Sequence, residues 1–285
     1  MNGNIAPFSH AAMQARPYPE ASAAAADLRQ VLTGSDLLKP SSNRALQDPL
    51  SYRSMAYTLG EVRSAQARLE NALAIQINHT DDNPLVLING LPEADDSAQM
   101  RSYEIDGAGS PAIVPTANFN FLPVASAVAA LNEAHAKLSE IITQQTLRME
   151  NPEITKLPRF LSDPDNSGHA FGAIQKPFAA SNEKIKLLAR PLWYDGAVLA
   201  GNIEDTASMS EQTIQNGSEI IKGLYEIAAY QLLHAAQAVD LRQGLTLSSD
   251  SRRLYQAYRG EVPYLRADTP TTPLIEKSIR FLQQY

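Results

Sequence analysis

The sequence from residue 51 to residue 78, SYRSMAYTLGEVRSAQARLENALAIQIN, carries apolar side chains at roughly helical spacing without a single proline. A proline inside a helix removes a hydrogen bond and clashes with the preceding turn, so an uninterrupted stretch of this kind predicts one long helix. A helix of that length favours a bundle, in which neighbouring long helices bury its apolar side.

Further helices are expected along the chain, and the segment from 81 to 117 interrupts them. That segment contains several prolines and glycines and two short β-branched stretches, LVLI and AIV, which are typical of a small β or irregular insertion. The sequence therefore predicts an all-α, long-helix bundle with a small irregular or β insertion near 84–116. The expected helices cover 20–32, 51–78, 121–149, 169–189 and 206–242, followed by two short amphipathic helices.

The predicted organisation is an N-terminal helix and loop over 1–50, a central long-helix bundle over 51–247 and short C-terminal helices over 248–285. Neither a composition shift nor an internal repeat separates these parts, so we expect one continuous domain.

Composition excludes several classes of function. The net charge of −7 and the absence of a basic run argue against a nucleic-acid footprint. With no cysteine, the chain has no disulfide, no thiolate nucleophile and no cysteine-type zinc site. The N-terminus MNGNIAPFSH lacks the layout of a signal peptide, and no apolar stretch is long enough for a membrane helix, so we expect a cytoplasmic protein.

The histidines give no sign of a metal site, because none of the five shows HExxH or another close ligand spacing. His135 and His234 fall inside predicted helices and are expected to be packed or surface residues. His79 and His169 flank polar turns and are the better site candidates.

Three polar turns stand next to predicted helix ends, and each has a structural interpretation. In QDP, Asp48 would be an N-cap with Pro49 in the first turn. The turn DDNP would stop a helix, and in GNIED the acidic pair Glu204 and Asp205 would favour the positive end of the following helix.

The same turns also hold a set of groups suited to binding a small amino or carboxylic acid. Arg53 offers a planar guanidinium that can grip a carboxylate through two hydrogen bonds. Gln47 and Asn83 can orient a substrate or hold a carbonyl oxygen, Glu204 can accept a proton or bind an amine or imidazole, and Phe119 would add a flat wall.

Six blocks of sequence, in order, resemble the carboxy-terminal part of the histidine/phenylalanine ammonia-lyase family. QDPLSYRSMAYTLG is similar to the family's QDPYSLR segment, and INHTDDNPLVL to INSxTDNPL. The other four blocks are TANFNFLPVASAVAALNEAHAKLSE, NSGHAFGAIQKPFAASNEK, AGNIEDTASM and LLHAAQAVDLR. Each block alone is a weak signal, whereas the ordered series is specific.

The resemblance implies a helical tetramer whose active sites are built from several subunits. It also implies an electrophilic 4-methylideneimidazol-5-one (MIO) group, made from an Ala-Ser-Gly tripeptide. This tripeptide does not occur among the 285 residues, so no residue of this chain is expected to form the cofactor, and MIO is expected from a partner chain.

The resemblance also implies residue roles. Arg53 would bind the substrate carboxylate, Gln47 and Asn83 would support the substrate and the MIO group, and Phe119 would line the aromatic pocket. Gln47 and Glu204 are the expected catalytic residues, and the glutamate at 204 matches histidine lyases, which favours an imidazole or another hydrogen-bonding substrate side chain.

Four departures from the family pattern alter this pocket. Leu50 stands where the family has a tyrosine, and Tyr52 faces about 200° away around a helix, so it cannot simply replace that phenol. Asn120, Ile203 and Thr206 replace a histidine, a glutamine and a histidine of the family motifs.

Three hypotheses remain open. The first is a split lyase, in which this chain is the carboxy-terminal subunit and an amino-terminal-half partner supplies the electrophile; Met1 favours separate translation. The second is a prosthetic-group-free family member that binds or converts a carboxylate and would expose apolar helix faces. The third is a non-catalytic partner that serves only to assemble an oligomer.

Overall fold

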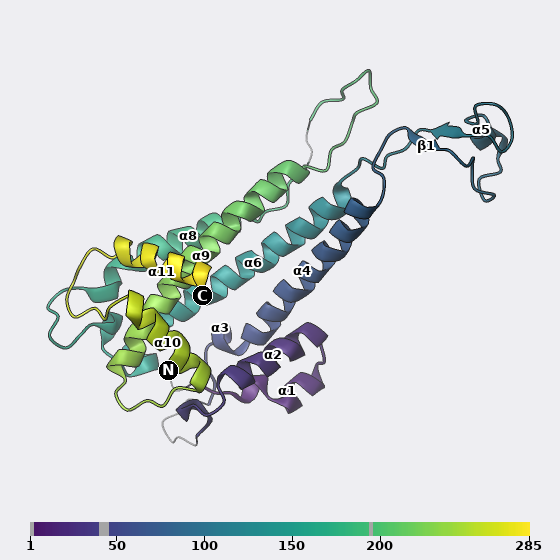
Figure 1. Ribbon diagram of the computed structural model, residues 1–285. Coiled ribbons are helices and arrows are strands. Elements are labelled where there is room, and N and C mark those ends of the chain that lie inside the picture. The colour runs from purple at the N-terminus through teal and green to yellow at the C-terminus, as the bar shows by residue number, and fades with distance from the viewer. Residues whose placement is uncertain (1–2, 40–45, 194–195) are drawn as a thin grey trace. The chain divides into compact units, whose positions relative to one another are not determined.

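The computed structural model describes residues 3–39, 46–193 and 196–285, and its secondary structure is mainly helical (Figure 1). Part of the loop predicted before residue 50, residues 40–45, lies outside the described residues. Three long helices dominate the rest: α4 (Met55–Asn78), α6 (Leu122–Met149) and α9 (Ser210–Leu241). The prediction of an all-α, long-helix fold is confirmed. Among the described residues, no helix is both long and apolar enough to cross a bilayer.

The chain divides into two compact units. Unit 1 contains residues 1–66, 129–190 and 215–285, and unit 2 contains residues 67–128 and 191–214. The proposed division of the sequence at residues 50 and 247 stays a prediction.

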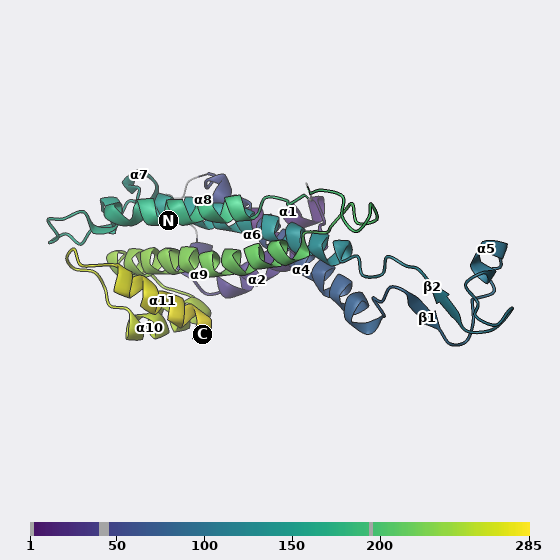
Figure 2. The same ribbon diagram turned by 90° about the horizontal axis from the view of Figure 1, so that it is seen from above.

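The core of unit 1 forms where α9 packs beside α6 and α8 (Gln175–Leu188) (Figure 2). Ile220 and Ile227 of α9, and Phe178 and Ile185 of α8, are almost fully buried, and each pair is seven residues apart, so both members fall on one helix face. A β-carbon added at Gly223 would lie 2.9 Å from Ile185 Cδ1, so this glycine permits the close approach of α8 to α9. Burial of each such side chain contributes about 1.5–3 kcal/mol.

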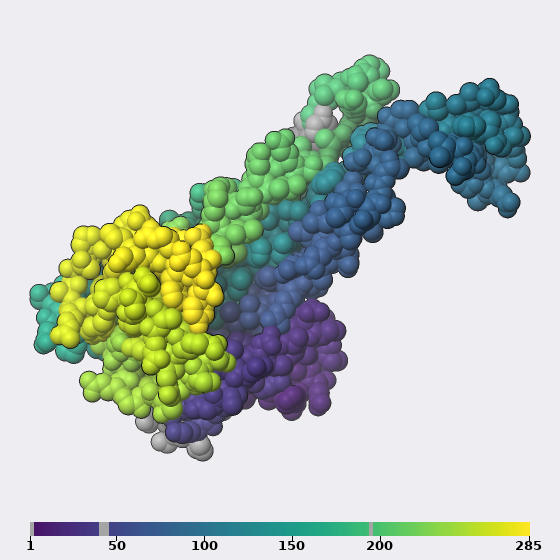
Figure 3. Space-filling view, in the orientation of Figure 1, coloured from purple at the N-terminus to yellow at the C-terminus, as the bar shows by residue number. Residues whose placement is uncertain are grey.

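Two C-terminal helices cover another side of this core. Helices α10 (Ser249–Glu261) and α11 (Thr272–Gln284) lie together on the surface of unit 1 (Figure 3). Tyr258, Val262 and Ile275 are buried and belong to the same core cluster as α8 and α9.

A smaller apolar cluster joins α1 (His10–Ala15), α2 (Pro19–Val31) and the start of α4 through Met13, Ala25 and Ala56. A β-carbon at Gly60 would lie 2.5 Å from the backbone nitrogen of Ala21. Glycine at this position therefore sets how closely α2 and α4 approach.

Unit 2 contains the insertion, which is confirmed as a small β element. Strands β1 (Leu85–Leu87) and β2 (Ala112–Val114) pair antiparallel, with Leu85 opposite Val114 and Leu87 opposite Ala112. The short helix α5 (Ala98–Arg101) lies in the segment between them.

Three of the predicted helices begin or continue differently. The helix expected from residue 51 is divided into α3 (Leu50–Arg53) and α4 at Ser54. The segment from 169 begins as a 3-10 turn, Ala170–Ile174, and continues as α8 with Pro177 in its first turn, where no N–H is needed. Helix α9 starts at Ser210 rather than Thr206, because Met209 takes a positive φ of 51° that a helix cannot contain. The short elements that were not predicted include α1, α7 (Pro152–Thr155) and the 3-10 turns Ala6–Phe8, Asp36–Leu38 and Arg159–Leu161.

Candidate functional site

Arg53 ends the short helix α3, and its guanidinium folds back on the start of that helix. Its Nε donates to the Asp48 carbonyl oxygen at 2.8 Å. Its two terminal amino groups have no hydrogen-bond partner within the described part of the chain, and the side chain is half-buried. The guanidinium is therefore oriented through Nε, while the amino groups that can grip a carboxylate remain open.

Asp48 does not cap the helix as predicted. The residue that precedes α3 is Pro49, and no side chain caps it. The buried carboxylate of Asp48 instead accepts a hydrogen bond from the backbone N–H of Asn4 at 2.6 Å. Asp48 thus ties the N-terminal segment to the α3 turn, and Gln47 beside it is exposed.

Tyr52 and Leu50 lie on different sides of α3. The Tyr52 hydroxyl donates to the Gln145 carbonyl oxygen of α6 at 3.0 Å, and burial raises the pKa of this phenol above its ordinary value. The Gln145 side chain donates to the Ser51 carbonyl at 2.8 Å, which fixes α3 to α6. Leu50 is 67% exposed. The Tyr52 phenol therefore packs against α6, and it does not occupy the exposed side of α3 where Leu50 lies.

Asn83 and Phe119 are brought onto neighbouring segments of unit 2. The Asn83 side-chain oxygen accepts from the Thr116 backbone N–H at 2.8 Å, and the Thr116 hydroxyl donates to the Asp82 carbonyl at 2.8 Å. These bonds hold the turn that precedes β1 against the loop that follows β2. In the described residues, the Asn83 amide nitrogen has no partner, and Phe119, which follows in the same loop, is 62% exposed.

Glu204 projects from a tight turn of unit 2. Its backbone pairs with Leu199: Leu199 N–H donates to the Glu204 carbonyl at 2.8 Å, and Glu204 N–H donates to the Leu199 carbonyl at 3.3 Å. The predicted capping role for Glu204 and Asp205 is wrong, since α9 starts only at Ser210. The exposed Glu204 carboxylate has no hydrogen bond or ion pair with any described residue.

The five predicted site residues are thus divided between the units. Gln47 and Arg53 lie in unit 1, whereas Asn83, Phe119 and Glu204 lie in unit 2. Each lies in a turn, in a loop or at the end of a short helix, and the two charged ones keep polar atoms available for a ligand.

The histidines expected near polar turns have local roles. His79 Nδ1 lies 2.8 Å from the Ile75 carbonyl, and the backbone N–H of His169 donates to the Asp268 carboxylate at 2.8 Å. Burial lowers the pKa of His135. No group of three His, Asp or Glu side chains among the described residues is placed to hold a metal ion.

A buried ionisable pair in unit 1 was not predicted. Glu150 is 2% exposed and His234 is fully buried, and their Oε1 and Nε2 atoms lie 2.8 Å apart. His234 Nδ1 lies 2.6 Å from the Tyr230 carbonyl oxygen, and Gln175 donates to the other oxygen of Glu150. A carbonyl can only accept, so Nδ1 carries a proton and the carboxyl–imidazole contact shares a second one. The position of His234 inside a predicted helix was the one signal in the sequence.

Comparison with known proteins identifies the family of this chain. The sequence profile of the family described as aromatic amino acid lyase matches residues 1–260. The chain belongs to the aromatic amino acid lyase family. The recognition made from six sequence blocks is therefore confirmed.

Relatives within the aromatic amino acid lyase family match almost the whole chain. The histidine ammonia-lyase of Deinococcus radiodurans is 29% identical over 93% of this chain and 47% of its own length. The structure of ergothionase from Treponema denticola, an ergothioneine-degrading enzyme, has a TM-score of 0.88 and 29% identity, covering 99% of this chain and 53% of that one. For the tyrosine aminomutase of Streptomyces globisporus the TM-score is 0.84 and the identity 25%, covering 99% and 54%. The chain spans about half the length of the curated relatives it matches.

Proposed function

We propose that this chain is the carboxy-terminal subunit of a split aromatic amino acid lyase. Its substrate is an aromatic or imidazole-bearing α-amino acid, and the reaction is the elimination of ammonia or a related addition or 2,3-shift. The observation that carries the proposal is the availability of the two charged site residues. Arg53 keeps both terminal amino groups and Glu204 keeps its carboxylate without a partner among the described residues. Membership of the family and the similarity to histidine ammonia-lyases support it.

The residues of this chain bind and orient the substrate. Arg53 grips the α-carboxylate through its two amino groups, while Nε stays bound to the Asp48 carbonyl. Glu204 accepts a hydrogen bond from an imidazole N–H or a proton from an amine. Phe119 packs against the substrate ring, and Gln47 supplies an amide next to Arg53.

The electrophile comes from outside these 285 residues, because no Ala-Ser-Gly tripeptide occurs among them. Asn83 and Phe119 suit an uncharged, flat group that carries a carbonyl oxygen, since they present an amide N–H donor and an exposed ring on loops tied together through Thr116. When bound, an MIO group would supply an electrophilic carbon for the amine or ring of the substrate. Asn83 would hold such a group through its amide N–H, and Phe119 would shield it from water. An amino-terminal-half partner of the same family carries it, in an oligomer with a tetrameric core.

A second candidate function is favoured by two exposed apolar residues. Leu50 is 67% exposed and Ile203 is 80% exposed, at positions where the family motifs have a tyrosine and a glutamine. Exposed apolar side chains of this kind suit a non-catalytic assembly partner, or a family member without the prosthetic group that uses Arg53 to bind a carboxylate.

Native and intact mass spectrometry of the protein purified with its neighbouring gene products tests the assembly. We expect a second chain with an Ala-Ser-Gly segment that is lighter by two waters, lost in cyclisation and dehydration. A stable homo-oligomer of this chain alone, with no such segment, would contradict the split lyase.

Kinetics of the assembled complex test the site. Arg53→Ala is expected to lower kcat/KM for an aromatic amino acid by about 10- to 100-fold, the size of a lost charge-assisted contact. Arg53→Lys keeps the charge and is expected to recover only part of this loss. Arg252→Ala, at an exposed arginine of α10, is the matched control. Unchanged turnover in Arg53→Ala would leave only the assembly role.

A further inference from the structure

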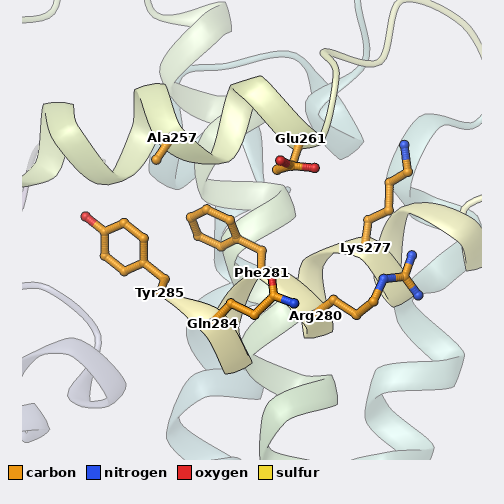
Figure 4. Close-up of a pocket in the computed structure, with 7 residues that line it drawn as sticks. All are labelled: Ala257, Glu261, Lys277, Arg280, Phe281, Gln284 and Tyr285. Carbon is orange, nitrogen blue, oxygen red and sulfur yellow. The ribbon is translucent and has the colours of Figure 1, made fainter.

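A cavity of about 420 Å³ lies between α10 and α11 in unit 1 (Figure 4). Ligand sites for small molecules typically have volumes of about 300–1,000 Å³. Glu261 and the whole of α11 follow residue 260, where the match to the family profile ends. The cavity is therefore formed largely by residues that lie beyond this match. It is lined by Ala257, Glu261, Lys277, Arg280, Phe281, Gln284 and Tyr285.

Three charged side chains face this cavity without pairing with one another. Glu261 comes from α10, and Lys277 and Arg280 come from α11. None of the three makes a hydrogen bond or an ion pair with a described residue, whereas elsewhere in unit 1 exposed helix charges do pair, as Lys222 does with Glu219 at 2.6 Å. Both signs of charge are therefore available to a ligand.

Aromatic rings form the other end of the cavity. In Figure 4, Phe281 lies in the middle, with Lys277 and Arg280 on one side of it and Tyr285 on the opposite side. The rings of Phe281 and Tyr285 stack with centroids 5.1 Å apart, and the buried Tyr258 ring meets Phe281 edge-on at 5.4 Å. The Tyr258 hydroxyl is in turn bonded to Ser278 of α11 at 2.7 Å. Phe281 is thus held from the core side and offers a fixed apolar surface.

We propose that the cavity between α10 and α11 binds an aromatic α-amino acid as its zwitterion. The ring packs against Phe281 and Tyr285, the α-carboxylate binds Lys277 and Arg280, and the ammonium group binds Glu261. Only a ligand with a ring and both charges satisfies all of these groups at once. The inference does not rest on the proposed function, because it uses none of the residues assigned to the substrate.

Equilibrium binding by isothermal titration calorimetry on the full chain tests this inference, with L-phenylalanine as the probe. We expect saturable binding that is weakened about tenfold or more by the double variant Lys277→Gln/Arg280→Gln, since a charge-assisted contact is lost. Glu261→Gln is expected to weaken L-phenylalanine binding but to leave 3-phenylpropanoate, which lacks the ammonium group, unaffected. The matched controls are Arg252→Gln and Glu276→Gln, at exposed positions of α10 and α11 that do not line the cavity.

Arg53→Gln separates this site from the proposed substrate site. Binding that persists in Arg53→Gln and weakens in Lys277→Gln/Arg280→Gln supports the inference. Binding that disappears in Arg53→Gln and is unchanged in the double variant would overturn it, while it would strengthen the proposed function. Absence of saturable binding to the wild-type chain, or equal binding of L-phenylalanine and phenethylamine, which lacks the carboxylate, would also overturn it.

Discussion

Polar side chains differ in their environment between the buried interior of unit 1 and the loops of unit 2. In unit 1, Glu150 bonds to both His234 and Gln175, and Glu150 and His234 are almost fully buried. In unit 2, Glu204 and the amide nitrogen of Asn83 are exposed and have no partner among the described residues.

This difference separates groups that stabilise the fold from groups that are available to a ligand. A buried polar group without a partner is costly, which is why Glu150 and His234 bond to each other in the core. An exposed group can instead exchange water for a substrate. The following changes test that distinction, in order of decreasing effect.

Replacement of Glu150 should have the largest effect. Glu150→Ala leaves His234 Nε2 buried without its partner, so we expect the free energy of unfolding to fall by about 3–5 kcal/mol. Urea denaturation measures this change. The double variant Glu150→Leu/His234→Leu removes both polar groups and should cost less than the single change. A loss below about 1 kcal/mol in Glu150→Ala would show that the pair is not needed for stability.

The packing of α2 on α4 should be sensitive to one added methyl group. Gly60→Ala brings a β-carbon within 2.5 Å of the Ala21 backbone nitrogen, and backbone cannot move aside cheaply, so we expect a loss of about 1–3 kcal/mol. Gly260→Ala in α10 meets nothing within 4 Å and is the matched control, expected to stabilise by about 0.5–1 kcal/mol. Thermal unfolding of both variants measures the difference, and a neutral Gly60→Ala would contradict the close approach of the helices.

In unit 2, replacement of Glu204 should change the activity of the complex and not the stability of the fold. Glu204→Gln keeps the shape of the side chain, and the carboxylate has no partner to lose, so the free energy of unfolding should change by less than about 0.5 kcal/mol. We expect kcat/KM of the assembled complex to fall about tenfold or more, because an amide cannot take a proton. A loss of stability with unchanged kcat/KM would place Glu204 among the structural residues.

The smallest expected effect is the contribution of the Asp268 carboxylate to the pH dependence of folding stability. Its carboxylate accepts hydrogen bonds from the Asn166 amide and from the backbone N–H groups of His169 and Ala170, which lower its pKa below the ordinary value of 3.8. The folded state therefore favours the charged form. Its contribution to stability is present above pH 3.8 and is lost as the pH falls below that value, through the pKa of the folded state.

Asp268→Asn should remove this part of the acid dependence. Unfolding measured between neutral pH and about pH 3 should show a shallower decline for the variant than for the wild type. Parallel curves would mean that another carboxylate is responsible, and Asp163, whose pKa is also lowered by its hydrogen bond from Tyr264, would be tested next.

The long helices and the insertion could be read from the sequence, because helical spacing and prolines act locally. The ends of the helices could not be predicted as well. The beginning of α9 depends on a positive φ at Met209, and the role of Asp48 depends on Asn4, 44 residues away. Local sequence could not predict either feature, since a methionine rarely adopts a positive φ and the bond of Asp48 joins distant segments.

By itself, the sequence determined the all-α class, the positions of the long helices and the family, through motifs whose order needs no coordinates. Only the tertiary structure decided which polar groups are buried and paired and which remain open. Glu150 and His234 are 84 residues apart, and Tyr52 and Gln145 are 93 apart. Whether a polar side chain serves the core or a ligand depends on what other segments bring within hydrogen-bond distance, and that information exists only after the helices have packed.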